Sequence, residues 1–267
     1  MNPAVLNLGS AAVYAVLGAL AWRAPAVARH RAILLVVLAA WLVQGAALAH
    51  TLWIEGQLFL GVGHSIAAFT WIAVATLGVV SLRDQASALG MLVWPFAALG
   101  CVAAEVWPEV HAIAGSDRPL LQGHLVAAIL AYAFFTLAGL QAWLMQWTEG
   151  RLHAGRVDGW VSQLPPVMTQ ERILFRLIWS GFVLLTLNLV SGALFAEEIF
   201  GRALPFNHKT VLGITSWLIF GWLLLGRHVG GWRGRIAARM TIAGCIVLLL
   251  AYIGARFVAE IVLGRVT

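Results

Sequence analysis

Charged side chains are scarce in this sequence. Asp, Glu, Lys and Arg make up 10% of its 267 residues, whereas soluble globular proteins average about 25%. So few charges cannot cover a water-exposed surface of this size. Apolar residues make up 61% and form long runs, such as Ala32–Ala49 and Ile242–Ala255. Runs of about 18 apolar residues match the ~30 Å hydrocarbon core of a bilayer, so we predict an integral membrane protein.

Cysteine and the common catalytic motifs are nearly absent. The two cysteines, Cys101 and Cys245, each lie inside an apolar run, and there is no C-x-x-C pair. A disulfide framework, a zinc ribbon and a thioredoxin-like site are therefore not expected. The sequence also lacks G-x-x-x-x-G-K-[ST], G-x-S-x-G and H-E-x-x-H, the signatures of P-loop, serine-hydrolase and zinc-protease sites. We do not expect an enzyme in the narrow sense.

Helices are the expected spanning form, because lipid offers no partner to the backbone and a helix satisfies its own hydrogen bonds. The apolar runs are too long and uniform for the alternating pattern of a barrel. We therefore predict an all-α, polytopic helical bundle that forms a single transmembrane domain over residues 1–267. The spans, about eight in number, are expected at residues 3–22, 32–53, 62–82, 88–106, 123–147, 172–196, 209–226 and 240–263.

Basic residues lie between the apolar runs and favour one side of the membrane. This pattern argues against a nucleic-acid partner, despite the net charge of +6. Cytoplasmic loops of membrane proteins carry an excess of Lys and Arg. Of the 17 Lys and Arg residues, 12 follow spans 1, 3, 5 and 7 or flank those loops, and 5 lie on the other side. Both termini are therefore expected outside, and the longest loop, residues 148–171 with Pro165 and Pro166, inside.

Five of the eight histidines fall on the predicted outer side, and four of these stand at helix ends. They are His50, His64, His111, His124 and His208; the inner side holds His30, His153 and His228. Imidazole is the commonest protein ligand to metals and also binds haem iron. Two outer histidines on neighbouring helices could hold an iron from both sides. Taken singly, each one is more often a hydrogen-bonded interface residue, and that alternative stays open.

A haem site also needs apolar walls and cations for the propionates. The outer side offers both. The aromatic residues are Trp53, Trp107, Phe200 and Phe206, and the basic residues are Arg118, Arg202, Lys209 and Arg256. Aromatic belts are common at membrane interfaces, and Arg256 could instead pair with Glu260 at i,i+4 spacing. In span 6, Thr186, Asn188 and Ser191 are expected to make interhelical hydrogen bonds rather than a polar path.

Several motifs in order resemble the cytochrome c assembly family of haem-handling membrane proteins, of the CcsA/CcmC type, and within it the HemX/YpjD-type inner-membrane branch. The assembly-like portion is expected over about residues 60–265. The matching segments are His124-Leu-Val-Ala-Ala-Ile-Leu-Ala-Tyr132, Gly181-Phe-Val-Leu-Leu-Thr186, Ser191-Gly-Ala193, Asn207-His-Lys209, Ser216-Trp-Leu-Ile-Phe220, Gly231-Trp-Arg-Gly234 and Ala251-Tyr-Ile-Gly254.

The resemblance implies a haem site at the outer face, with His124 at the position of the family's first outer haem histidine. The family's tryptophan-rich outer segment is altered here: its Trp positions are Phe200, Leu204 and Phe206, while Lys209 is kept. The second outer histidine is replaced by Leu263, and a histidine late in the seventh span by Leu225. We therefore expect His208 to be the second iron ligand. His50 and His64 are the alternative pair.

The resemblance thus predicts a haem-binding accessory factor of cytochrome c biogenesis in a bacterial inner membrane. Phe200, Phe206, Lys209 and Arg256 would contact the haem, and membrane lipid and other cytochrome c assembly proteins would be its partners. Two alternatives remain: a haem-free regulator of tetrapyrrole synthesis that acts through the 148–171 loop, and an accessory subunit of a transporter.

Overall fold

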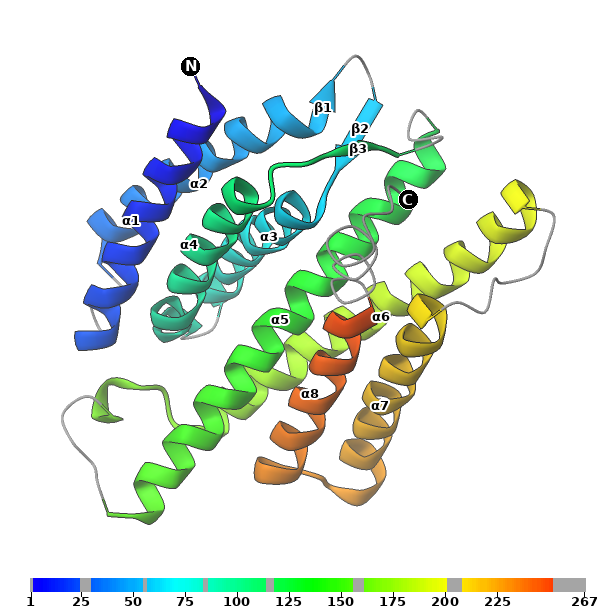
Figure 1. Ribbon diagram of the computed structural model, residues 1–267. Helices are drawn as coiled ribbons and strands as arrows, with labels where there is room; N and C mark the ends of the chain where they lie inside the picture. The colour runs from blue at the N-terminus through cyan, green and yellow to red at the C-terminus, as the bar shows by residue number, and fades with distance from the viewer. Residues whose placement is uncertain are drawn as a thin grey trace. The chain divides into compact units, whose positions relative to one another are not determined.

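The computed structural model describes residues 2–24, 30–54, 57–83, 86–113, 118–155, 161–200 and 208–251 (Figure 1). The chain forms two compact units. The first consists of residues 1–117 and 144–173, and the second of residues 118–143 and 174–267. The helices α5 and α6 therefore contribute residues to both units. The single domain predicted from the sequence stays a prediction.

In the described part of the chain, eight α-helices overlap the eight predicted spans. They are α1 (Pro3–Arg23), α2 (Arg31–Leu52), α3 (Val62–Arg83), α4 (Gly90–Val106), α5 (Pro119–His153), α6 (Val167–Phe200), α7 (His208–Gly230) and α8 (Gly234–Leu249). Within the described ranges, 6 helices are long and apolar enough to cross a membrane, and α4 is a shorter apolar helix. The protein is thus a multi-pass helical membrane protein; the count of eight crossings and the side of each terminus stay predictions.

Helices α5 and α6 are longer than predicted. With 35 and 34 residues and a rise of 1.5 Å per residue, each extends about 50 Å, well beyond the ~30 Å hydrocarbon core. The predicted bounds of the 148–171 loop were therefore wrong, because both helices continue into its polar ends. What remains holds a short 3-10 helix, η3 (Val161–Gln163). The Gln170 amide donates to the carbonyl of Pro165 at 2.9 Å, and this bond ties the first turn of α6 to the proline pair before it.

In the first unit, α1 packs against α2 and α4, and α3 packs against α2 and α4. Small residues let these helices approach closely: a Cβ on Gly18 of α1 would overlap the ring of Pro95 in α4. Between α2 and α3, the indoles of Trp41 and Trp71 stack with centroids 4.6 Å apart. Each indole N–H also donates to the carbonyl of the other residue, at 3.0 and 2.8 Å.

Three short strands join the helix ends of the first unit and were not predicted. They are β1 (Trp53–Ile54), β2 (Gln57–Leu60) and β3 (His111–Ala112), and β2 pairs antiparallel with both others. They lie at one end of α2 and α3 (Figure 1). Strands this short carry no readable alternation, so an all-α bundle was the only pattern visible in the sequence. A short 3-10 helix, η2 (Ala86–Leu89), precedes α4.

In the second unit, aromatic rings and small residues close the contacts between helices. Phe135 of α5 stacks on Phe220 of α7 with centroids 4.0 Å apart. The Cys245 thiol of α8 donates to the carbonyl of Phe135 at 3.0 Å, and the Ser216 hydroxyl of α7 donates to the carbonyl of Gly244 in α8 at 3.0 Å. Cys101 and Cys245 are both buried and free, as small core residues would be.

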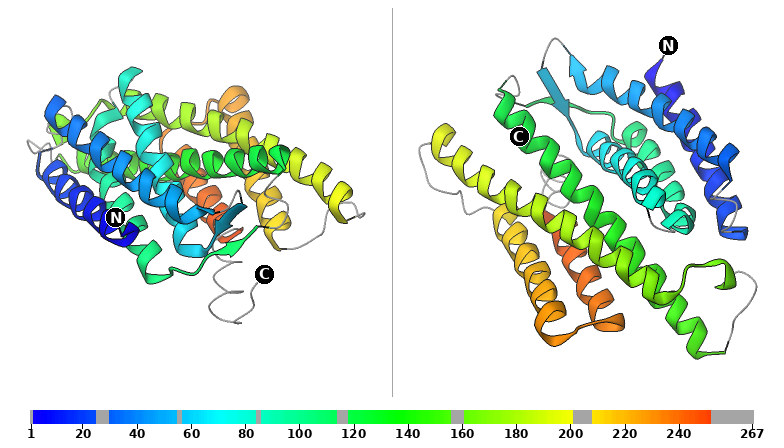
Figure 2. Two further views of the ribbon diagram at one scale, coloured as in Figure 1. Left: turned by 90° about the horizontal axis from the view of Figure 1, so that it is seen from above. Right: turned by 180° about the vertical axis from the view of Figure 1, so that it is seen from behind.

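The turn between α7 and α8 explains one of the family motifs. Gly231 and Gly234 adopt positive φ angles of 61° and 54°, which L-residues with a Cβ rarely adopt. Between them, the indole of Trp232 folds back over Gly226, where any Cβ would overlap it. The two helices therefore run side by side and antiparallel, as all three views show (Figures 1 and 2).

Candidate functional site

His124 is the one predicted haem ligand whose side chain lies within the described residues in the second unit. It stands near the start of α5 and is partly buried. Its Nδ1 lies 2.8 Å from the Ser191 hydroxyl of α6. The Asn188 amide, one helical turn earlier, donates to the His124 carbonyl at 3.0 Å. Two side chains of α6 therefore hold both the ring and the backbone of His124.

The hydrogen bonds of Ser191 bear on the tautomer of this imidazole. The Ser191 hydroxyl also lies 3.1 Å from the Asn188 carbonyl, to which it donates. A hydroxyl has one hydrogen, so with that hydrogen on the carbonyl, Nδ1–H of His124 donates to the serine oxygen; the Asn188 amide nitrogen, which can only donate, lies 3.4 Å from the same Nδ1 and favours the other tautomer. In the tautomer protonated at Nδ1 the lone pair is on Nε2, and a hydrogen bond at the other ring nitrogen is how proteins orient histidines that bind metals.

The predicted partners of His124 are less completely described. His208 is the first residue of α7 and Phe200 the last of α6, but their side chains lie outside the described part of the chain. Phe206 and Arg256 fall wholly outside it. Lys209 follows His208 and is exposed. A shared site of His124 and His208 therefore stays a prediction.

The residues that hold His124 were expected only to join helices. Interhelical bonding is confirmed for Asn188 and Ser191, which reach α5, and for Thr186, which accepts from the Trp217 indole of α7 at 2.9 Å. Their role as supports of His124 was missed. The signal was present in the Ser191-Gly-Ala193 motif, whose serine bonds to the ring and whose Gly192 lies against it: a Cβ there would be 3.4 Å from Cε1 of His124.

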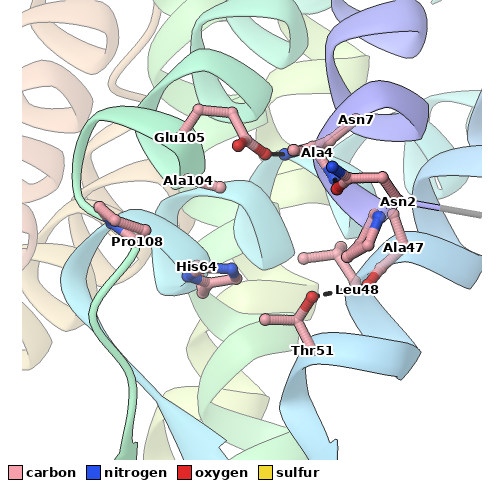
Figure 3. A pocket seen from close by; sticks show the side chains of 11 residues that line it. Asn2, Ala4, Asn7, Ala47, Leu48, Thr51, His64, Ala104, Glu105 and Pro108 are labelled. Carbon is pink, nitrogen blue, oxygen red and sulfur yellow. Dashed lines mark hydrogen bonds between the residues drawn. The ribbon is translucent and has the colours of Figure 1, made fainter.

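A second group of polar side chains lines a cavity of about 170 Å³ in the first unit. Four helix ends converge on it: the start of α1, the end of α2, the start of α3 and the end of α4. His64 enters from α3, where Gly63 packs directly on the backbone of α4. In Figure 3, the Glu105 carboxylate points toward Asn7, and the His64 ring lies below them between Pro108 and Thr51.

Hydrogen bonds fix one side of this cavity. The Asn7 amide donates to Glu105 Oε1 at 2.9 Å and to the Cys101 carbonyl at 3.1 Å. The Thr51 hydroxyl donates to the Ala47 carbonyl within its own helix at 3.0 Å. Asn7 is 4% exposed and His64 is 6% exposed, yet Asn7 Oδ1 and His64 Nδ1 have no hydrogen-bond partner in the described structure.

His50 and His64, the alternative ligand pair, lie in different environments. His64 lines the cavity, whereas His50 is exposed and does not line it. The inner histidines His30, His153 and His228 are all exposed. Within the described ranges, no group of three or more His, Cys, Asp or Glu side chains is placed to hold a metal ion.

Comparison with known proteins identifies relatives over most of the chain. A profile of the family described as "Cytochrome C assembly protein" matches residues 30–263. The inner membrane protein YpjD of Escherichia coli K12 is 29% identical over 184 residues, 69% of this chain and 69% of YpjD. An uncharacterized 28.8 kDa protein of Azospirillum brasilense is 29% identical over 202 residues, 73% of this chain and 74% of that protein.

The cytochrome c biogenesis protein CcsA of Prochlorococcus marinus is 37% identical over 87 residues, 33% of this chain and 28% of CcsA. No solved structure matches the chain. The resemblance read from the motifs, including the YpjD-type branch, is confirmed. The profile begins near the start of α2 and ends close to the C-terminus, and the chain therefore belongs to the cytochrome c assembly protein family.

Proposed function

We propose that this protein holds haem at the outer face of a bacterial inner membrane, as an accessory factor of cytochrome c biogenesis. The family and the named relatives support this role, since one relative is an inner membrane protein and another a cytochrome c biogenesis protein. The single observation that carries the proposal is the set of hydrogen bonds that hold His124. An imidazole at the mouth of a membrane helix is held by Ser191 and Asn188 of the neighbouring helix.

The hydrogen-bonded ring of His124 fits an iron ligand. A ligating histidine uses one ring nitrogen for the metal and donates from the other, which fixes its tautomer and direction. Here Nδ1 is engaged by Ser191, so Nε2 is the nitrogen for iron. Haem bound in this way would be cargo, and its iron would accept two axial imidazoles. The second is proposed to come from His208, the first residue of α7.

Residues near His208 and in the C-terminal part of the chain would supply the remaining contacts to haem. Phe200 and Phe206 are proposed to pack against the porphyrin, in place of the tryptophans of the related segment. Lys209 and Arg256 would pair with the propionates, because carboxylates bind cationic donors strongly. Attachment of haem to an apocytochrome would require other cytochrome c assembly proteins, and this protein would not be the enzyme of that step.

The direct test is the absorption spectrum of the protein purified in mild detergent, before and after addition of haem. A Soret band that saturates at about one haem per chain is expected. His153→Ala is the matched control, because that histidine is exposed and bonds to the Glu149 carbonyl of its own helix at 2.7 Å. Failure to bind haem even after supplementation would refute the proposal and leave the regulatory and transporter alternatives.

The outer location rests on the distribution of basic residues. Reporter fusions at the C-terminus and near Gly155 should report opposite sides, with Gly155 in the cytoplasm. Gly155 lies at the end of α5 with φ of 67°, in a turn that tolerates an insertion. A cytoplasmic C-terminus would contradict both the eight-span topology and the proposed outer site.

A further inference from the structure

The cavity of the first unit contains buried polar atoms that the protein itself does not satisfy. Asn7 and His64 both line it, and their buried atoms Oδ1 and Nδ1 have no partner among the described residues. Buried polar atoms in native proteins are nearly always hydrogen-bonded, to protein, water or a ligand. Two such atoms on side chains that line one cavity therefore indicate that a bound molecule, with a small adjustment of these side chains, completes their hydrogen bonds.

The hydrogen bonds already formed show what that occupant must offer. Both N–H groups of the Asn7 amide are used, on Glu105 and on the Cys101 carbonyl. The Thr51 hydroxyl hydrogen is used on Ala47. The lining residues are left with acceptors: the Glu105 carboxylate, the buried Asn7 Oδ1 and, in the tautomer protonated at Nε2, the buried His64 Nδ1. A complementary occupant is a hydrogen-bond donor.

The charge and the walls of the cavity narrow the choice further. Among the described residues that line it, Glu105 is the only charged one, and none is Phe, Tyr or Trp. A carboxylate with no Lys or Arg among the described lining residues favours a cation. The described residues form no cluster of three His, Cys, Asp or Glu, so the donor set of a tight transition-metal site is lacking. Quaternary ammonium ions are usually recognised by aromatic cages, which this cavity also lacks.

We propose that the cavity binds a primary ammonium group. Such a group has three N–H donors and one positive charge, matching the three acceptors Asn7 Oδ1, His64 Nδ1 and the Glu105 carboxylate. The apolar side chains of Pro3, Ala47 and Leu48 would contact the carbon attached to the nitrogen. This site is separate from the haem site proposed around His124, and neither requires the other.

The size of the cavity agrees with a small group. Its volume of about 170 Å³ equals that of about six waters at ~30 Å³ each. It is smaller than the ~300–1,000 Å³ of typical sites for drug-sized ligands, so a porphyrin does not fit inside. A primary ammonium of this size could come from a soluble amine or from the head group of an ethanolamine phospholipid.

Equilibrium dialysis of radiolabelled methylammonium against the full-length protein in detergent tests this directly. Saturable binding of about one methylammonium per chain is expected, with no competition from tetramethylammonium, which has the same charge and no N–H. Glu105→Gln should weaken binding by roughly tenfold or more, since hydrogen bonds to charged groups are the strong ones. Glu109→Gln is the matched control: Glu109 is exposed, lies four residues further along the chain beyond the end of α4 and does not line the cavity, so this variant should bind as the wild type does.

A second variant covers the case in which Glu105→Gln does not fold. Ala4→Leu keeps every polar group and fills the cavity from a partly exposed position in the first turn of α1, so it should abolish binding in a folded protein. Equal competition by tetramethylammonium, or wild-type affinity in folded Glu105→Gln or Ala4→Leu, would overturn the proposal. Haem binding is scored separately, so loss of one activity identifies which site has failed.

Nanodiscs distinguish the two sources of the ammonium group. Protein in phosphatidylcholine nanodiscs should bind methylammonium as in detergent. If phosphatidylethanolamine nanodiscs weaken that binding, the lipid head group occupies the cavity. If the two lipids give the same affinity, the occupant is a soluble amine.

Discussion

His64 and His124 each stand near the start of a helix, one in each unit, but their surroundings differ. His124 is held by Ser191 and Asn188, whereas Nδ1 of the more deeply buried His64 has no partner. The difference extends to the units around them. The first unit also buries the unpartnered Tyr14 hydroxyl and Gln44 Oε1, whereas the described residues of the second unit contain no unpartnered buried side-chain atom.

This contrast separates two ways in which a membrane protein prepares a polar site. In the second unit, the protein supplies the supporting hydrogen bonds, so that one imidazole is oriented in advance. In the first unit, the protein leaves acceptors open inside a small cavity, so that an occupant must supply the donors. The first arrangement suits a ligand to iron, and the second suits a small donor such as ammonium.

The largest effect on folding is expected where helix backbones meet in the first unit. Gly18→Ala should lower the free energy of unfolding by about 3 kcal/mol, the upper end of the usual overpacking cost, because its Cβ would overlap the rigid ring of Pro95. Gly9→Ala in the same helix is the control, since nothing lies within 4 Å of its Cβ position. Denaturant titration in detergent measures both, and equal stabilities would contradict the close α1–α4 contact.

Replacement of His124 and of His64 by leucine should show the difference between the two units most clearly. His124→Leu should cost roughly 1–3 kcal/mol, because it leaves the partly buried Ser191 hydroxyl without its imidazole partner, while Asn188 keeps the backbone carbonyl of residue 124. His64→Leu should be close to neutral, since it removes a buried polar atom that already lacks a partner. Thermal unfolding of both variants, without added amine, provides the comparison. A large loss of stability for His64→Leu would mean that the cavity does not hold an unpartnered imidazole.

A smaller effect is expected from the paired indoles of the first unit. Trp71→Phe keeps an aromatic ring against Trp41 but removes the 2.8 Å hydrogen bond to the Trp41 carbonyl. The loss should be about 1 kcal/mol, the usual net value of one hydrogen bond. The Phe135–Phe220 stack of the second unit has no such bond, so Phe220→Leu should change stability through packing alone. A Trp71→Phe protein as stable as the wild type would show that the indole N–H contributes nothing.

Much of the helical framework could be predicted from the sequence, because a ~30 Å apolar layer requires about 20 apolar residues for each crossing. Within the described residues, each of the eight predicted segments contains an α-helix. The polar ends of α5 and α6 were missed, because hydropathy marks the lipid-facing part of a helix and not its continuation into water. The strands β1, β2 and β3 were missed because their pairing joins residues as far apart as Leu60 and His111.

The candidate sites were predictable to different degrees. His124 could be identified from a local motif, although Asn188 and Ser191 lie 64 and 67 residues further along the chain. The first-unit cavity could not be predicted, since it depends on how four helix ends converge. Within it, only the folded structure shows that the donors of Asn7 are used and its acceptor is not.

The measurement that tests the central proposal most directly is the Soret absorbance of His124→Ala and His208→Ala at saturating haem. Each protein is compared with the wild type and with His153→Ala, and its fold is checked by circular dichroism. Each outer variant should lose most of the bound haem, because each substitution removes one of the two proposed axial ligands. The His153→Ala protein should retain its haem. A wild-type Soret band in both folded outer variants would contradict the assignment of haem to His124 and His208.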